Sequence, residues 1–133
     1  MTVLRPRGFL LDAGALRSAE ADPRGDVWDL CRQEHIAGRQ PLLPIMVLAQ
    51  IWRGGPRQAG MARVVNSCEV VGLDGTMARR IGKLLGQSGT SDVVDAMVVL
   101  AAMDAGATVV TSDPGDIAKI ADSVGARIPL FTV

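Results

Sequence analysis

The sequence predicts an α/β fold of three layers, with a central, mainly parallel sheet of four to five strands between two layers of helices. Short segments rich in bulky and β-branched residues alternate along the chain with longer segments of helical character. Apolar residues make up 48% of the 133 residues, which is enough to bury a sizeable core without disulfides. We therefore expect one domain over residues 1–133.

Four segments are predicted as strands because they are short, apolar and flanked by Gly, Asp or Pro, namely residues 9–11, 68–71, 108–111 and 128–133. The middle two are expected to be buried and parallel. Helices are expected at residues 27–37, 45–53, 58–65, 77–85, 92–105 and 117–124. Asp26 is expected to cap the first helix, and Pro44 to favour the start of the second. A long helical insert thus separates the first two predicted strands.

Net charge, hydropathy and cysteine spacing limit the classes of protein to which the chain can belong. The formal net charge is zero, so binding to a nucleic acid would need a local basic patch. No apolar run is long enough to span a bilayer, and the segment around Arg5 and Arg7 does not resemble a signal peptide. Cys31 and Cys68 form no CxxC pair. A reduced, cytoplasmic setting is the simplest expectation.

Aspartates gather where the predicted strands end. Asp12 closes the first strand, Asp74 follows the second, and Asp113 follows the third, while Asp92 and Asp95 open the helix before that third strand. Ligands of open α/β sheets bind beyond the carboxyl ends of the strands. The acidic side chains are therefore predicted to meet at one edge of the sheet.

Helix capping is the alternative explanation for each aspartate alone. Asp74 precedes Gly75 and is expected to be only a cap. Asp113 before Pro114 suits an N-cap with proline at the first helical position, and Asp116 would lie in the first turn. Asp92 and Asp95 fit the same pattern. A purely structural domain with capped helices would follow from this interpretation.

The set of aspartates as a whole favours a metal site. Residues 96–103, directly after Asp95, are apolar on all sides, so this helix is expected to be buried. Carboxylates crowded at its start repel one another unless they take up a proton or a cation. Oxygen ligands without His or Cys favour Mg²⁺ or Mn²⁺ over Zn²⁺. His35, the only histidine, is expected to be structural, on a surface helix with Glu34.

Four motifs resemble those of PIN domains. They are Leu-Leu-Asp-Ala-Gly-Ala-Leu at 10–16, Ser-Asp-Val-Val-Asp-Ala at 91–96, Val-Val-Thr-Ser-Asp-Pro-Gly-Asp-Ile at 109–117, and the helical segment 44–53. Together they cover nearly the whole chain in the order of the family. Within it, the sequence is most similar to the VapC group, the toxin halves of toxin–antitoxin pairs.

The resemblance implies a PIN-like fold and an endoribonuclease that depends on Mg²⁺ or Mn²⁺. It assigns catalysis to Asp12, Asp95 and Asp113, metal binding to these three with Asp92 and Asp116, and supporting roles to Gln50, Thr111 and Ser112. It also implies an RNA substrate, a cognate antitoxin protein as partner and a homodimer. Gln50 stands where the family has glutamate and brings no charge, so a catalytically weakened module that binds RNA or protein is the alternative.

RNA contacts are expected from basic residues on the segment after the second helix and on the helix at 77–85, namely Arg53, Arg57, Arg79, Arg80 and Lys83. A merely solvated face is the alternative for them. The apolar helix at 45–52 is expected to support a dimer or to receive the antitoxin. A receiver-like phosphoacceptor domain is a further alternative, but the first motif lacks an adjacent acidic pair and residues 128–133 contain no Lys.

Overall fold

The computed structural model describes residues 8–133, so the segment that contains Arg5 and Arg7 lies outside the described residues. The strands are β1 (Phe9–Leu11), β2 (Leu42–Pro44), β3 (Glu69–Val71), β4 (Thr108–Thr111) and β5 (Leu130–Thr132). The helices are α1 (Ala13–Ala21), α2 (Asp26–Ile36), α3 (Ile45–Ile51), α4 (Ala59–Asn66), α5 (Gly75–Ser88), α6 (Val93–Ala105) and α7 (Pro114–Ser123), and η1 (Pro56–Gln58) is a short 3₁₀ turn. All six predicted helices are present.

The five strands form one sheet in the order β3-β2-β1-β4-β5, and every neighbouring pair is parallel. The prediction of a mainly parallel sheet of four to five strands is confirmed. β1 and β4 lie side by side in the middle, with Leu11 opposite Val110. From this pair the chain leaves in opposite directions, since β1 leads to β2 and β4 leads to β5.

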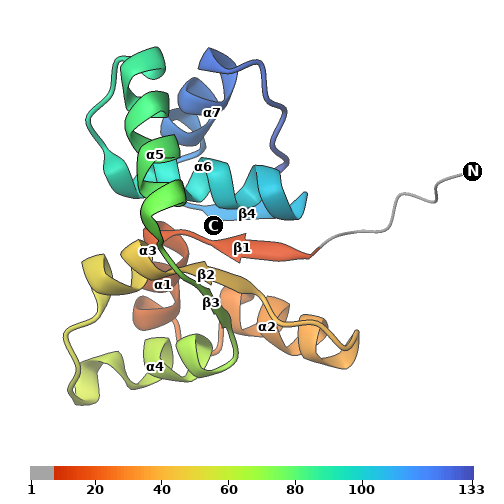
Figure 1. Cartoon of the computed structure of the whole chain (residues 1–133). Coiled ribbons are helices and arrows are strands. Elements are labelled where there is room, and N and C mark those ends of the chain that lie inside the picture. The colour runs from red at the N-terminus through yellow and green to blue at the C-terminus, as the bar shows by residue number, and fades with distance from the viewer. Residues whose placement is uncertain (1–7) are drawn as a thin grey trace, which may run out of the picture.

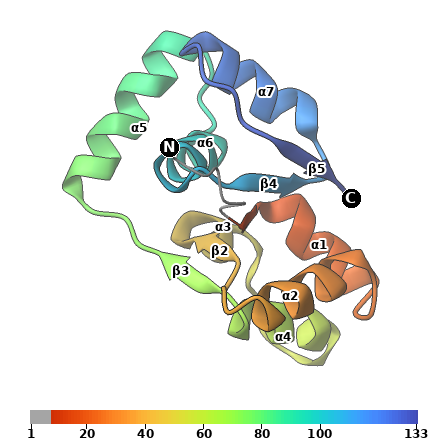
Figure 2. The ribbon, with the colours of Figure 1, turned by 90° about the vertical axis from the view of Figure 1, so that its right-hand side faces the viewer.

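Helices cover both faces of the sheet, as expected (Figures 1 and 2). α1, α2 and α4 pack together on one side, and α5, α6 and α7 pack together on the other. α6 contacts both β2 and β4, and its residues Ala96–Ala102 are buried. Because this helix is apolar on all sides, it forms the centre of its layer. No helix among the described residues is long and apolar enough to cross a membrane.

Two elements were not predicted from the sequence. β2 has only three residues, and it ends in Pro44, which has no N–H to donate to a ladder. Its place between β1 and β3 stabilises it nonetheless. α1 is rich in small residues, with Gly14 in its first turn, so its apolar periodicity is weak. It buries Ala15 and Leu16 beneath the sheet, and tertiary packing therefore supplies its stability.

Two other predictions were wrong in detail. The segment 68–71 was expected to be a buried strand, but β3 is an edge strand whose residues Glu69 and Val70 are exposed. An edge strand pairs on one side only, which the apolar sequence does not reveal. Asp26 was expected to cap α2, but Gly25 occupies the N-cap position and Asp26 is the first helical residue.

Candidate metal centre

The candidate site lies beyond the carboxyl ends of β1 and β4. Because the chain leaves these two strands in opposite directions, their carboxyl ends form the topological switch point of the sheet, which is where open α/β sheets bind ligands. Asp12 directly follows β1, and Asp113 follows β4 after Ser112. The backbone N–H of Asp12 donates to the carbonyl of Val110 at 3.2 Å, which ties the two strand ends together.

Asp12 is buried and fixed in place. Its Oδ1 accepts a hydrogen bond of 3.0 Å from the backbone N–H of Ala15, so it caps α1. The residue is only 7% exposed. Gly14 lets the first turn of α1 lie against β4, because a Cβ there would lie 2.8 Å from the backbone nitrogen of Ser112 and closer still to its side chain. The Ser112 loop thus lies directly beside the α1 turn that holds Asp12.

Asp92 and Asp95 are brought to the same edge by the first turn of α6. Asp92 is the N-cap, and its Oδ1 accepts a hydrogen bond of 3.0 Å from the backbone N–H of Asp95. The capping explanation is therefore correct for Asp92, as it is for Asp74, which accepts from the N–H of Met77 at 2.8 Å. Capping uses one oxygen of Asp92. It leaves the half-buried carboxyl of Asp95 without a capping role.

Asp113 and Asp116 come from the loop after β4 and the first turn of α7. Asp113 stands at the N-cap position, but its side chain makes no capping hydrogen bond. Its backbone N–H donates instead to the hydroxyl of the fully buried Thr111 at 2.9 Å. Capping thus fails to explain the Asp113 carboxyl, which interacts with that of Asp116.

Interactions between these carboxyls link Asp12, Asp92 and Asp116 to Asp95, and Asp113 to Asp116. Burial, followed by the charges of Asp92, Asp116 and Asp12, raises the pKa of Asp95 to about 7. The pKa of Asp116 is raised by its contact with Asp113, with a smaller contribution from Asp92. Burial also raises the pKa of Asp12, and the Thr111 hydroxyl opposes this shift. Acids from the end of β1 and the starts of α6 and α7 therefore repel one another, whereas Asp113 acts only on Asp116, and a shared site of Asp12, Asp95 and Asp113 stays a prediction.

Two cations near the acidic edge were not singled out in the sequence. Arg17 lowers the pKa of Asp12, and Lys119 lowers that of Asp116, but each is the last and weakest contribution to the shift. Lys119 follows Asp116 by three residues on a helix, a spacing that could have been noticed. These two charges therefore oppose only a small part of the shifts.

The donor set suits a hard divalent ion, since every carboxyl and hydroxyl at this edge offers oxygen. Within residues 8–133, however, no three His, Cys, Asp or Glu side chains are already arranged to hold one ion directly. The chemistry of the site fits Mg²⁺ or Mn²⁺, and water molecules would have to complete the coordination.

Gln50 lies near the end of α3 and is exposed. Among the side-chain hydrogen bonds of the described residues, none joins its amide to an aspartate of the site. Ser112 is exposed at the site. Thr111 is buried, and its hydroxyl accepts a hydrogen bond from the backbone N–H of Asp113. The supporting role predicted for Thr111 thus has a structural basis, and the one predicted for Gln50 has no contact behind it.

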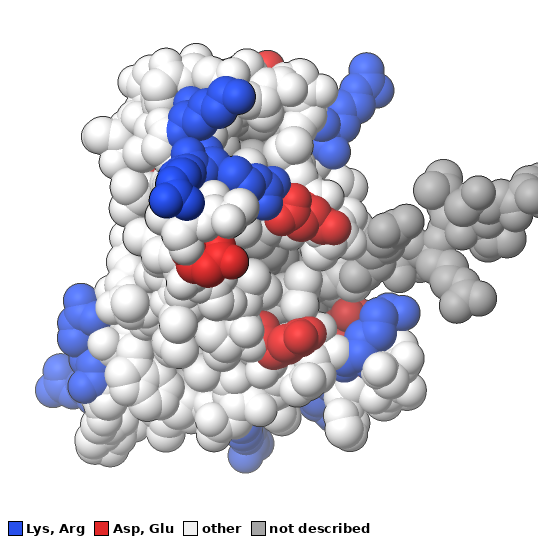
Figure 3. Space-filling view, viewed as in Figure 1, with Lys and Arg blue, Asp and Glu red and all other residues white. Residues whose placement is uncertain are grey.

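The basic residues predicted to bind RNA fall into two groups. Arg53 and Arg57 are exposed, and Arg53 follows α3 in a loop held by buried Gln58, whose Oε1 accepts from the N–H groups of Arg53 and Gly54 at 2.9 and 3.0 Å. The second group lies on α5, where Lys and Arg side chains gather on the face shown in Figure 3.

Arg80 of this second group is not at the acidic edge. Its guanidinium donates to both carboxylate oxygens of Asp104 at 2.7 and 2.8 Å. Asp104 is nine residues beyond Asp95 on α6, which corresponds to about 13 Å along a helix axis. Arg80 is therefore engaged elsewhere, while Arg79 and Lys83 on the same helix are exposed.

Trp28 and Trp52 occupy different surroundings. The guanidinium of Arg63 lies 4.3 Å from the centre of a Trp28 ring, so that face already has a cation on it. Trp52 is 42% exposed and, with Ile45, Leu48, Ala49 and Val65, lines an apolar hollow. The expectation of an apolar surface on the helix at 45–52 is confirmed.

Comparison with known proteins identifies the fold. No protein-family model matches the chain, and no curated protein matches it. VapBC2 from Rickettsia felis, in a crystal structure with a DNA fragment from its promoter, aligns over 94% of this chain and 98% of its own, with 15% identity and a TM-score of 0.67. PAE2754 from Pyrobaculum aerophilum aligns over 91% and 90%, with 18% identity and a TM-score of 0.57.

These likenesses extend over almost the full length of both known chains, at a low sequence identity. They establish a shared fold, and the three-layer PIN-like α/β/α architecture expected from the four motifs is confirmed. The chain is thus a protein of PIN-like fold with an acidic edge at its topological switch point.

Proposed function

We propose that this chain is an endoribonuclease that depends on Mg²⁺ or Mn²⁺ and acts as the toxin of a VapBC-type toxin–antitoxin pair. The observation that carries the proposal is the set of acids around Asp95, whose pKa is raised to about 7 by burial and by the charges of Asp92, Asp116 and Asp12, while Asp113 raises the pKa of Asp116. The PIN-like fold supports the same activity. So does the oxygen-only donor set, which suits the proposed ion.

In this proposal Asp12, Asp95 and Asp113 hold the ion, with Asp92 and Asp116 completing the acidic surroundings. The bound ion would supply positive charge that neutralises a phosphoryl oxygen of RNA and would promote attack by water on phosphorus. Asp12 is oriented for this role by the N–H of Ala15, and the Asp113 backbone is fixed by the Thr111 hydroxyl. No covalent nucleophile from the protein is required.

RNA would approach over basic side chains outside the acidic edge. Arg53, Arg57, Arg79 and Lys83 are exposed, so their charges are free to contact phosphates. Arg80 contributes less to this proposal because its guanidinium pairs with Asp104. Contacts of this kind predict that RNA binding weakens steeply as the salt concentration rises.

An antitoxin and a second copy of the chain are the partners in this proposal. VapBC2 was crystallised with a DNA fragment from its promoter, which supports a toxin–antitoxin setting by analogy of fold. The apolar hollow around Trp52 and Ile45 offers a surface for a protein contact. Trp52→Glu is expected to reduce self-association, as measured by light scattering, without a change in fold.

Cleavage of RNA with and without metal tests the proposed activity. Purified protein and a structured RNA are incubated with Mn²⁺, with Mg²⁺ or with excess chelator. We expect cleavage with either ion, none with chelator, and recovery when Mn²⁺ is restored. Stabilisation by Mn²⁺ without cleavage of any RNA would contradict the nuclease proposal and would favour a binding module.

That binding module is the second candidate, and the position of Gln50 favours it. The residue is exposed, carries no charge and makes no hydrogen bond to the aspartates within the described part of the chain. Gln50→Glu adds a carboxylate at this position. If α3 reaches the site when an ion is bound, the variant should bind Mn²⁺ several-fold more tightly and cleave faster. Unchanged affinity would show that position 50 does not act on the metal.

A further inference from the structure

The two cysteines, which are far apart in the sequence, lie in contact in the fold. Cys31 is on α2, and Cys68 follows α4 just before β3. Each thiol shifts the pKa of the other, and the Ser67 hydroxyl acts on both, so the two cysteines lie close together. Neither cysteine is in a disulfide in this structure. The fold thus pairs two thiols that sequence spacing alone gave no reason to associate.

The surroundings of the pair hold the two sulfurs in place. Cys31 is 1% exposed and belongs to the hydrophobic core, against which Cys68 also packs. The Sγ of Cys68 lies 3.2 Å from the carbonyl oxygen of Val64, and the Ser67 hydroxyl donates to the same oxygen at 2.6 Å. These contacts hold Ser67 and Cys68 at the end of α4.

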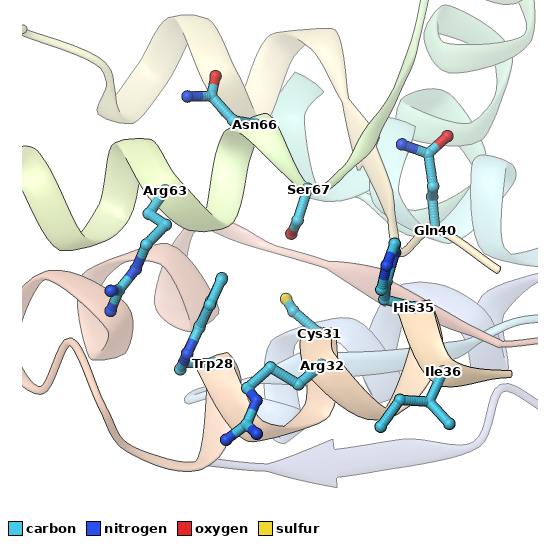
Figure 4. Close-up of a pocket in the computed structure, with 9 residues that line it drawn as sticks. All are labelled: Trp28, Cys31, Arg32, His35, Ile36, Gln40, Arg63, Asn66 and Ser67. Atoms are coloured by element: carbon cyan, nitrogen blue, oxygen red, sulfur yellow. The ribbon is translucent and has the colours of Figure 1, made fainter. Parts of the chain in front are cut away.

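A groove gives small molecules access to the thiols. It has a volume of about 620 Å³, and Cys31 and Ser67 are among its lining residues, together with Trp28, His35 and Arg63. Figure 4 shows the sulfur of Cys31 pointing from α2 into this space, toward Ser67 at the end of α4. Cys68 is itself partly exposed. A molecule as small as hydrogen peroxide therefore has a path to the pair.

The contact between the thiols also tunes their reactivity. The hydrogen bond with Cys68 lowers the pKa of the Cys31 thiol, whereas the same contact and burial raise the pKa of Cys68. The thiolate is the nucleophile in thiol oxidation, so whichever thiol of the pair is ionised reacts with the oxidant. The other cysteine is then the resolving thiol.

We propose that Cys31 and Cys68 form a redox-active thiol pair, which a peroxide closes into an intrachain disulfide that ties α2 to the end of α4. One thiolate of the pair attacks one oxygen of hydrogen peroxide, which breaks the O–O bond, gives a sulfenic acid and releases hydroxide, which the thiol proton converts to water. The sulfur of the other cysteine then attacks the sulfenic sulfur, and a second water leaves. Two thiols are oxidised and one peroxide is reduced.

The disulfide would change the groove as well as the stability. Its sulfurs must approach to about 2.05 Å, which fixes α2 against the end of α4 at the floor of the groove. Because the bond closes a loop from residue 31 to residue 68, it is expected to restrict the unfolded chain and raise Tm by roughly 5 °C. Reduction by a dithiol would restore the open pair.

The test uses the full chain, reduced, freed of reductant and treated with hydrogen peroxide in the presence of chelator. Peptide mapping without reduction should identify one Cys31–Cys68 cross-link within a single chain, accompanied by a higher Tm, and dithiothreitol should reverse both. Two free thiols after treatment would overturn the proposal. So would separate sulfinic acids or links only between chains.

Single substitutions test whether the cross-link and the rise in Tm depend on these two cysteines. Cys31→Ala and Cys68→Ala should each lose the cross-link and the peroxide-dependent rise in Tm, while Ser67→Ala should keep both. If a cysteine variant does not fold, mapping of the wild-type chain still decides. Because chelator removes any divalent ion, the outcome is independent of the proposed nuclease activity.

Discussion

Helix α6 carries an aspartate near each end, and the pKa values of their carboxyl groups are shifted in opposite directions from that of an ordinary aspartate. At the start of the helix, burial and neighbouring carboxylates raise the pKa of Asp95 to about 7. Near its end, the guanidinium of Arg80 lowers the pKa of Asp104. The helix dipole alone predicts the reverse order, because it stabilises negative charge at the N-terminus.

The helix dipole does not decide these pKa values because its effect is smaller than that of burial and neighbouring charges. It contributes about 0.3–1 kcal/mol, which is less than one pKa unit. Burial together with three neighbouring acids outweighs it at Asp95. Asp104 illustrates an acid that the protein neutralises with its own cation, whereas no cation contributes to the shift at Asp95. Perturbed, uncompensated acids of this second kind are typical of functional sites.

Asp95→Asn is expected to have the largest effect of the substitutions in α6. It removes a carboxylate from the proposed ion site, and RNA cleavage with Mn²⁺ is expected to fall about 100-fold or more. Initial rates on a fluorescent RNA would measure the change. Asp122→Asn on α7 is the matched control, since Asp122 is exposed and away from the acidic edge, and it should retain full activity. Equal losses in both variants would contradict the assignment.

Gly14→Ala tests how tightly the acidic edge is packed. A Cβ at Gly14 would meet the Ser112 backbone nitrogen at 2.8 Å, so the strand-end loops must shift. We expect a loss of about 1–3 kcal/mol in the free energy of unfolding, measured with urea. Gly86→Ala on α5 meets open space and should be neutral or stabilising by about 0.5–1 kcal/mol. A neutral Gly14→Ala would show that the edge is loosely packed.

The pH dependence of metal-free stability gives a third test. The pKa of Asp95 is raised to about 7 in the folded state, from an unfolded value near 3.9, so the folded state binds the extra proton. Its contribution to stability is present below pH 4 and is lost as the pH rises to 7. After allowance for partial exposure, the loss is about 1–2 kcal/mol.

Tm measured in chelator at pH 5 and pH 8 would report this slope. Asp95→Asn should reduce it, and saturating Mn²⁺ should offset the loss at pH 8. Asp12 and Asp116, whose pKa values are also raised, should leave a residual slope of the same sign in the variant. An identical pH profile in the variant would mean that Asp95 is an ordinary surface acid.

Asp104→Asn at the other end of α6 should have the smallest effect. The pair with Arg80 is exposed, so its loss is expected to cost less than about 1 kcal/mol. RNA cleavage and the response to Mn²⁺ should stay at wild-type levels. A large loss of activity would place the basic face of α5 in RNA binding instead.

The same contrast explains how much was predictable from the sequence. Periodicity located α6 and β4, and the rule that parallel strands end at one edge predicted that Asp12 and Asp113 lie at the same edge of the sheet. β2 and α1 were not predicted from the sequence. β2 has only three residues and α1 is a run of small ones, so both carry little periodic signal and depend on packing for their stability. The Arg80–Asp104 pair and the contact of Cys31 with Cys68 depend on how distant helices pack, which residue spacing does not encode.

A calorimetric titration with Mn²⁺ tests the central claim most directly, because it needs neither an RNA substrate nor a partner protein. Wild-type chain and Asp104→Asn should bind the ion with the same affinity and release protons at pH 7, whereas Asp95→Asn should bind at least about 10-fold more weakly. If all three proteins bind equally, or none binds, the acids at the carboxyl edge do not form a metal centre.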